Sequence, residues 1–255
     1  MRMVKAMIIA FSMYSQIPMP QFEWKDEDMK YILCFFPWIG AVIGGGIYLW
    51  GMICEKYEIS LLCYTLIGTA IPLLITGGFH VDGFMDTMDA FCSYQPREKK
   101  LEILKDSHIG AFAVIMFGVY GLLYVAAFSE IQDKNLLQIV CAGFFLSRCL
   151  SGISVVSFSS AKKEGMLYSF ASKAEKNIVK ISLCLQGIVC VLFMLWRSLF
   201  AGMLVVIAAF CAFAYYYDRS KKELGGITGD TAGYFVLLCE CSMVVVAAVI
   251  DIVWI

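Results

Sequence analysis

The stretch "LLCYTLIGTAIPLLITGGFHVDGFMDTMDAF", residues 61 to 91, joins an apolar run to three aspartates, Asp82, Asp86 and Asp89. Its apolar part approaches the roughly 20 helical residues that cross a bilayer core of about 30 Å. Similar apolar runs recur along the 255-residue chain, only 16% of whose residues are charged, and the mean hydropathy is +0.77. Soluble domains carry about a quarter charged residues. The sequence therefore predicts an all-α protein, a polytopic transmembrane helical bundle.

The apolar runs predict about seven spans within one integral-membrane domain covering residues 1–255. No internal repeat or low-complexity linker suggests a second domain. The net charge of −1 favours no nucleic-acid partner, so membrane lipid and small molecules are the expected partners. Whether the chain forms a homo-oligomer stays open. The spans are expected at 31–53, 59–79, 109–130, 135–158, 178–196, 198–217 and 232–254.

Lysine and arginine concentrate in every second connecting segment, and the alternate connections carry only Lys56, Lys134 and Arg197. The positive-inside rule places the basic segments in the cytoplasm. It also makes the N-terminal 30 residues a cytoplasmic segment with an interfacial or re-entrant helix. The basic segments are 1–30, 80–108, 161–177 and 218–231.

The three aspartates are spaced i, i+4 and i+7, which puts them on one face of a helix. Like charges at this spacing repel, so the arrangement favours a cation among them. Mg²⁺ commonly takes one or two carboxylates, waters and a substrate phosphate. The alternative is a solvated helix end without a ligand.

A second polar cluster, "LGGITGDTAGYFVLLCE", opens the last span. Thr228 or Asp230 can cap that helix, and its free N–H groups can also bind phosphate. Glu240 follows deeper in the span, where an ionisable group is a functional candidate. Its expected partners are Arg148, which lies in the fourth span, and a metal ion.

Two further polar segments belong to the basic side of the chain. In "LKDSHIGAFAV", Asp106 and His108 precede a span, and in "SSAKKEGM", Lys162 and Lys163 can hold substrate phosphates or act as cytoplasmic anchors. Clustered acids, a metal ion and basic residues, with no cysteine or serine nucleophile motif, favour phosphoryl or phosphodiester transfer.

The motifs "GGFHVDGFMDTMDAF", "LKDSHIGAFAV" and "GGITGDTAGYFVLLCE" resemble the adenosylcobinamide-GDP ribazoletransferases, or cobalamin synthases. "QIPMP" and "FFPWIGAVIG" look like further signatures, and the resemblance runs in order across nearly the whole chain. It implies a magnesium-dependent, multi-pass enzyme of the cell inner membrane with its active site on the cytoplasmic side. Such enzymes join adenosylcobinamide-GDP to α-ribazole or its 5′-phosphate, releasing GMP and forming adenosylcobalamin or its 5′-phosphate in cobalamin (vitamin B12) biosynthesis.

The resemblance also implies roles for individual residues. It assigns catalysis to His80, Asp82 and Asp106, with His80 or Asp106 taking the proton of the attacking hydroxyl. The implied ligands of Mg²⁺ are Asp82, Asp86, Asp89 and Glu240. The implied substrate contacts are Arg148, Thr228, Gly229 and Asp230, to which the basic pair Lys162 and Lys163 is added from the sequence itself.

The sequence departs from the family pattern at four single positions, and residues 160–164 only loosely follow a more basic and aromatic stretch of the family. Ala90 and Ala113 stand where glycine is usual, and Gln16 and His108 stand where arginine is frequent. The missing arginines put phosphate contacts at these two positions in doubt, although a protonated His108 can substitute.

Two other functions fit the composition less well. A CDP-alcohol phosphotransferase needs an Ala-Arg pair after Asp-Gly-x-x, whereas Asp86 and Thr87 follow here. An ion-coupled transporter would place acidic residues near the middle of the membrane in broken helices, whereas only Glu240 and Arg148 lie deep in this chain.

Overall fold

The computed structural model describes residues 2–162, 168 and 172–254. Within these residues the chain is helical, and the one β-type pairing is an isolated bridge between Ser160 and Ile227. The predicted all-α class is therefore confirmed.

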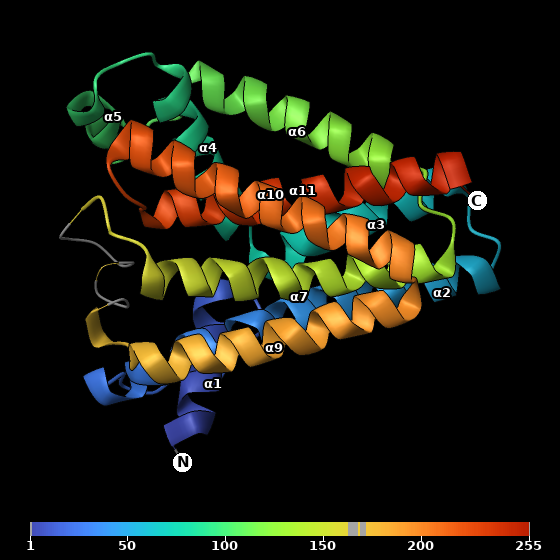
Figure 1. Ribbon diagram of the computed structural model, residues 1–255, viewed down its shortest axis with the longest axis horizontal. Coiled ribbons are helices and arrows are strands. Elements are labelled where there is room, and N and C mark those ends of the chain that lie inside the picture. The colour runs from blue at the N-terminus through green and yellow to red at the C-terminus, as the bar shows by residue number, and fades with distance from the viewer. Residues whose placement is uncertain (1, 163–167, 169–171, 255) are drawn as a thin grey trace.

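Most helices run parallel to the long axis of a bundle (Figure 1). In the part of the chain that the structure describes, six helices are long and apolar enough to cross a membrane. The first of these crossings is α2 taken together with the 3-10 helix η1 (Asp26–Phe35) that leads into it. A seventh crossing is counted if α3 and α4 form one broken span. The bundle helices are α2 (Phe36–Lys56), α3 (Leu61–Thr76), α6 (Ala111–Ser129), α7 (Lys134–Ser157), α9 (Lys176–Arg197), α10 (Leu199–Leu224) and α11 (Gly229–Trp254).

The second predicted span, 59–79, ends earlier than expected. Helix α3 stops at Thr76, because Gly77 and Gly78 adopt left-handed conformations with φ of 62° and 79°, which glycine tolerates at no steric cost. The chain then turns by 93° into α4 (Phe79–Cys92). Helix α4 thus crosses the end of the bundle, outside the parallel helices, instead of continuing the span.

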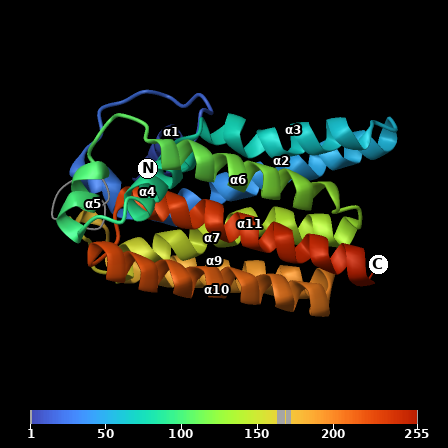
Figure 2. The same ribbon diagram turned by 90° about the horizontal axis from the view of Figure 1, so that it is seen from above.

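The α4 end of the bundle also holds α1 (Arg2–Tyr14) and α5 (Arg97–Ile103), while the C-terminus lies at the opposite end (Figures 1 and 2). The connection between α10 and α11, residues 225–228, lies at the α4 end as well. These are the basic segments of the sequence, so the predicted alternation of connections is reproduced. The expected N-terminal helix is present as α1, and its placement against a membrane stays a prediction.

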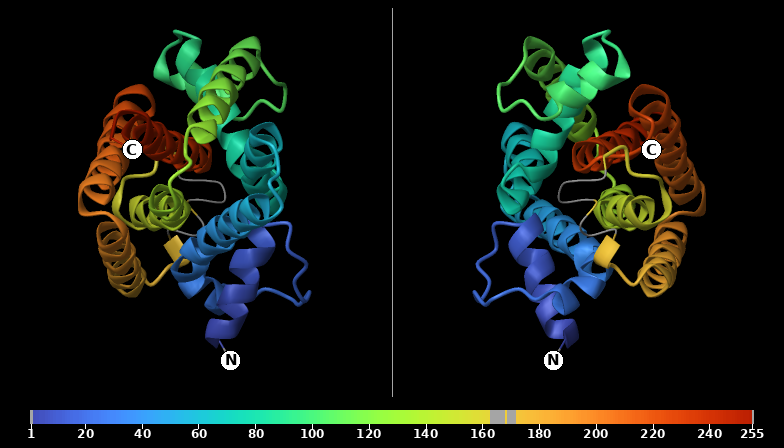
Figure 3. Two further views of the ribbon diagram at one scale, coloured as in Figure 1. Left: turned by 90° about the vertical axis from the view of Figure 1, so that its right-hand side faces the viewer. Right: turned by 90° about the vertical axis from the view of Figure 1, so that its left-hand side faces the viewer.

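Helix α7 forms the centre of the bundle, packed between α2, α9 and α11 (Figure 3). Over their most apolar 18 residues α7 is 83% buried, whereas α6 is only 22% buried. Helix α2 approaches α7 at Gly40 and Gly44, where an added Cβ would overlap the backbone carbonyls of Phe144 and Cys141. Small residues allow this close packing between apolar helices, as the glycine-rich sequence predicts.

Candidate active site at the α4 end

Helix α4 crosses the first turns of α11 at two glycines. A Cβ added to Gly83 would lie 2.8 Å from the carbonyl oxygen of Asp230, and one added to Gly233 would lie 3.2 Å from that of His80. A side chain at Gly83 would force the two backbones apart, and one at Gly233 would be a tight contact. The crossing therefore brings the acidic face of α4 against Asp230, which sequence reasoning assigned to substrate binding and not to the aspartate group.

Four carboxylates gather around this crossing. Asp82 is exposed, whereas Asp86, Asp89 and Asp230 are half-buried. Burial, followed by repulsion from the three neighbouring carboxylates, raises the pKa of Asp86 to about 6. Among the described residues no base forms an ion pair with these four carboxylates, so negative charge is concentrated here.

The segment after α5 lies directly over the third aspartate of α4. An added Cβ at Gly110 would overlap the Asp89 carboxylate. A side chain at position 110 would have to displace this carboxylate, so the segment of residues 104–110 covers the end of the acidic face at close range.

The donor set suits a hard divalent cation, although it forms no closed cage. Among the described residues, no group of three or more His, Cys, Asp or Glu side chains is positioned to enclose a metal ion. Mg²⁺ needs only one or two carboxylates when waters and substrate phosphates complete its shell. Asp82, Asp86, Asp89 and Asp230 supply such oxygen ligands, so the residues present fit the implied ion.

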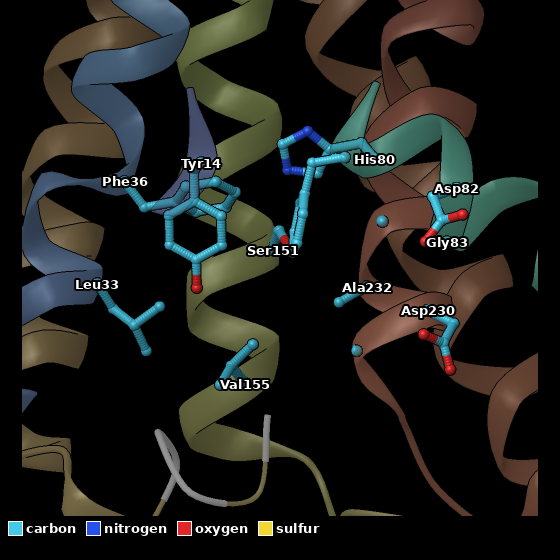
Figure 4. Close-up of a pocket in the computed structure, with 13 residues that line it drawn as sticks. Tyr14, Leu33, Phe36, His80, Asp82, Gly83, Ser151, Val155, Asp230 and Ala232 are labelled. Carbon is cyan, nitrogen blue, oxygen red and sulfur yellow. The ribbon is translucent and has the colours of Figure 1, made fainter. Parts of the chain in front are cut away.

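A cavity of about 180 Å³ opens beside the carboxylates (Figure 4). Aromatic and aliphatic side chains line one side of it, and Asp82 and Asp230 lie on the other (Figure 4). The lining residues are Tyr14, Leu33, Phe36, Phe79, His80, Asp82, Gly83, Ser151, Val155, Gly229, Asp230, Ala232 and Gly233.

His80 lines this cavity from the first turn of α4 and is only 4% exposed. Its ring stacks with that of Tyr14 at a centroid distance of 6.4 Å, and the Phe36 ring lies 5.7 Å away. Neither ring nitrogen has a hydrogen-bond partner among the described residues. Burial, and next the charge of Arg148, hold the pKa of His80 well below its usual range. The imidazole is therefore neutral, with one free donor and one free acceptor.

Glu240 and Arg148 form a buried pair with side chains 5% and 1% exposed. The Glu240 carboxylate accepts hydrogen bonds from the Arg148 guanidinium at 2.6 Å and the Ser147 hydroxyl at 3.0 Å. The expected pairing of the two charges is thus confirmed.

This pairing leaves two implied roles without support in the geometry. Glu240 lies ten residues beyond Asp230, about 15 Å along the helix, and is out of reach of an ion held on α4. Arg148 is directed at Glu240 and does not line the cavity, although its charge acts on His80.

The start of α11 is fixed by reciprocal capping. The Thr228 hydroxyl accepts a hydrogen bond from the Thr231 N–H at 3.2 Å, and the Thr231 hydroxyl accepts one from the Thr228 N–H at 2.8 Å. The capping interpretation of Thr228 is therefore confirmed. Of the residues assigned to substrate binding in this motif, Gly229 and Asp230 line the cavity.

The same connection also positions the basic segment that follows α7. The Ile227 N–H donates to the Ser159 carbonyl at 2.9 Å, and the Ala161 N–H donates to the Ile227 carbonyl at 2.8 Å. This bridge places Lys162 beside the carboxylates. Burial lowers the pKa of Lys162 overall, and the nearby charges of Asp230 and Asp86 oppose part of that effect. The other candidate lysine, Lys163, lies outside the described residues.

Asp106 does not line the cavity. Its carboxylate is exposed and lies 2.6 Å from Nδ1 of His108. Hydrogen bonds from the side chain and the backbone N–H of His108 lower the pKa of Asp106. The implied catalytic role is therefore not supported by its position on the segment that covers Asp89.

Sequence reasoning missed the wall opposite the carboxylates. Phe36 lies in the quoted signature "FFPWIG", which marked it without giving it a role. Tyr14, Ser151 and Val155 carry no motif. They reach the cavity because α1 and α7 end across it from α4, an arrangement that spacing along the chain does not reveal.

Comparison with known proteins identifies the family of the chain. The family model described as cobalamin-5-phosphate synthase matches residues 6–248. A Lachnoclostridium phytofermentans protein named adenosylcobinamide-GDP ribazoletransferase is 43% identical over 240 residues, 94% of this chain and 92% of that protein. Proteins of the same name from Clostridium perfringens, 33% identical over 96% of this chain and 98% of that protein, and from Listeria monocytogenes, 29% identical over 90% and 92%, are also similar. No solved structure matches. The chain belongs to the cobalamin-5-phosphate synthase family.

Proposed function

We propose that this chain joins adenosylcobinamide-GDP to α-ribazole or its 5′-phosphate and releases GMP, in a late step of cobalamin biosynthesis. The observation that carries the proposal is the crossing of α4 and α11. It brings His80 and Asp82 together with Asp230 around one cavity, in a chain whose family members bear that name. Grouped carboxylates next to a buried neutral base suit transfer of a phosphorus-containing group.

The reaction forms one phosphorus–oxygen bond and breaks another. The ribose hydroxyl of α-ribazole attacks the phosphorus nearer to cobinamide, and the bond from that phosphorus to the oxygen of GMP breaks. The hydroxyl proton goes to His80, whose neutral ring offers a lone pair inside the cavity. An anionic pyrophosphate beside His80 favours the protonated imidazole, so the basicity of the ring rises when substrate is bound.

The carboxylates and Lys162 act on the negative charge of the pyrophosphate. Mg²⁺, with Asp82, Asp86, Asp89 and Asp230 as the available ligands, would offset negative charge on the departing phosphate. Lys162, next to these carboxylates, contributes a fixed positive charge toward the pyrophosphate.

The test of this function is GMP release by purified protein supplied with both substrates and Mg²⁺. Replacing His80 by Gln keeps a polar group and removes the proton acceptor, so turnover should fall by about 10² or more. Asp106→Asn is the matched control and should change turnover by less than about threefold, because Asp106 lies outside the cavity. Absence of GMP with the unaltered protein would overturn the function, and a larger loss in Asp106→Asn would move the base to Asp106.

The α4 end is proposed to face the cytoplasm of a cell with the protein in its inner membrane, because this end carries the basic segments. A variant without the eleven native cysteines provides the background for two single changes, Arg97→Cys and Lys134→Cys. An impermeant thiol reagent on intact cells should label position 134 and leave position 97 unlabelled. Labelling of position 97 from outside would reverse the orientation.

A further inference from the structure

The cavity beside α4 has two chemically different walls. Tyr14, Leu33 and Phe36, all less than 9% exposed, form an apolar wall with Val155 of α7. The opposite wall carries the carboxylates (Figure 4). A molecule that fills this space therefore has one apolar end and one end that is polar or coordinates a cation.

The apolar wall is built largely of rings. Tyr14 and Phe36 lie 4.6 Å apart between centroids, and His80 stacks on Tyr14 with an interplanar angle of 11°. Aromatic walls favour flat aromatic ligands, through offset or edge contacts. The cavity is also far too small for a corrin ring, so of the two substrates only a base and part of its sugar can enter.

The polar atoms at the apolar end select among the bases that the substrates carry. Guanine presents an N–H and an amino group, and the adenine of the adenosyl group presents an amino group, that need acceptors, whereas the Tyr14 hydroxyl is the one side-chain acceptor of that wall. The aromatic base of α-ribazole offers mainly apolar edges and a ring-nitrogen acceptor. His80, with one donor and one acceptor nitrogen and no partner among the described residues, can donate to that base and accept from the sugar hydroxyl.

We propose that this cavity is the subsite for the aromatic base of α-ribazole and that Val155 and Leu33 set the size of base accepted. The inference rests on the function proposed above and adds which substrate occupies which space. With its base against the rings, the acceptor directs its ribose toward Asp82 and Asp230, where the phosphorus is attacked.

A second cavity leaves room for part of the donor. It measures about 470 Å³ and is lined by Ser15, Gln16 and the Gly77–Gly78 turn, together with Phe79 and Asp82, which also line the first cavity. The two spaces therefore adjoin at the first turn of α4. Attacking and leaving oxygens lie roughly in line on opposite sides of the phosphorus, so two adjoining spaces that share Asp82 suit this reaction.

The test compares two acceptors that differ only in base, α-ribazole and a ribonucleoside with a single-ring imidazole base, at saturating adenosylcobinamide-GDP. Val155→Phe narrows the cavity. It should lower kcat/KM for α-ribazole relative to the smaller acceptor by about tenfold or more, the scale of one misfitted apolar group. The KM for the donor should stay within about twofold. Val155→Ala widens the cavity and should shift the preference the other way, which keeps the test valid if the larger side chain prevents folding.

Val189→Phe is the matched control, because Val189 is 67% exposed on α9, away from the cavity. It should leave the acceptor preference unchanged. A rise in the donor KM with unchanged acceptor preference in both Val155 variants would overturn the inference and give the cavity to guanine. Because the unaltered protein still releases GMP in that outcome, the proposed function would stand while the subsite assignment fails.

Discussion

The acidic face of α4 and the Arg148–Glu240 pair are both charged clusters in an apolar chain, yet they are built in opposite ways. Glu240 is fully enclosed and receives hydrogen bonds from an arginine and a serine. The aspartates of α4 stand at the end of the bundle, close enough to raise the pKa of Asp86 to about 6. One cluster is neutralised inside the protein, and the other keeps an excess of negative charge.

This difference separates structural charge from functional charge. A buried carboxylate without a partner is too costly to keep, so Glu240 and Arg148 explain each other. Repulsion among the α4 carboxylates works against folding, and Lys162 offsets only part of it, so a bound cation would stabilise this face. The excess charge, and not the depth of a charge in the membrane, therefore marks the site.

Breaking the buried pair should give the largest effect. Glu240→Gln leaves Arg148 charged and enclosed, which should destabilise the fold by about 3–5 kcal/mol. Equilibrium unfolding in detergent measures this loss. The double change Glu240→Gln with Arg148→Gln should recover part of it, because no lone charge then remains.

Glu55→Gln provides the control for this prediction, since Glu55 pairs with Lys134 at the exposed far end at 2.7 Å. Surface pairs of this kind contribute little, so its unfolding should match the unaltered protein. Strictly additive losses in the double variant of the buried pair would contradict the pairing and point to separate partners for each charge.

Neutralising the α4 face should have the opposite profile, with lost activity and an intact fold. Asp82→Asn, Asp86→Asn and Asp89→Asn should each reduce GMP release by about 10², the scale of one preorganised electrostatic contact. Stability should hold or rise, because each change relieves repulsion. Added Mg²⁺ should restore part of the activity where the defect is ion affinity.

Asp218→Asn is the control, because Asp218 is exposed on α10. It should leave GMP release unchanged. If all three α4 variants kept near-normal GMP release at low Mg²⁺, the carboxylates would be a solvated helix end and not a metal site.

The sequence predicted more of this contrast than of the cavity between the clusters. Apolar length and charge alternation predicted the spans, and the spacing of Asp82, Asp86 and Asp89 predicted one acidic helix face. The turn at Gly77 was read as part of a span, because hydropathy does not report the left-handed conformation that ends α3. The role of Asp230 in the carboxylate group depends on how α11 crosses α4, which no local pattern encodes.

A change that separates α4 from α11 at their crossing should have the smallest effect. Gly83→Ala places a methyl group 2.8 Å from the Asp230 carbonyl oxygen, and neither atom belongs to a flexible side chain. The two helices must move apart, which should destabilise the fold by about 1–3 kcal/mol and lower GMP release by separating Asp82 from Asp230. Gly118→Ala makes the same chemical change on α6, where nothing lies within 4 Å. That variant should unfold no more easily than the unaltered protein, because alanine lowers the entropic cost of ordering a helix, and its activity should be unchanged. Equal behaviour of the two variants would mean that the close contact of α4 with α11 is not what assembles the site.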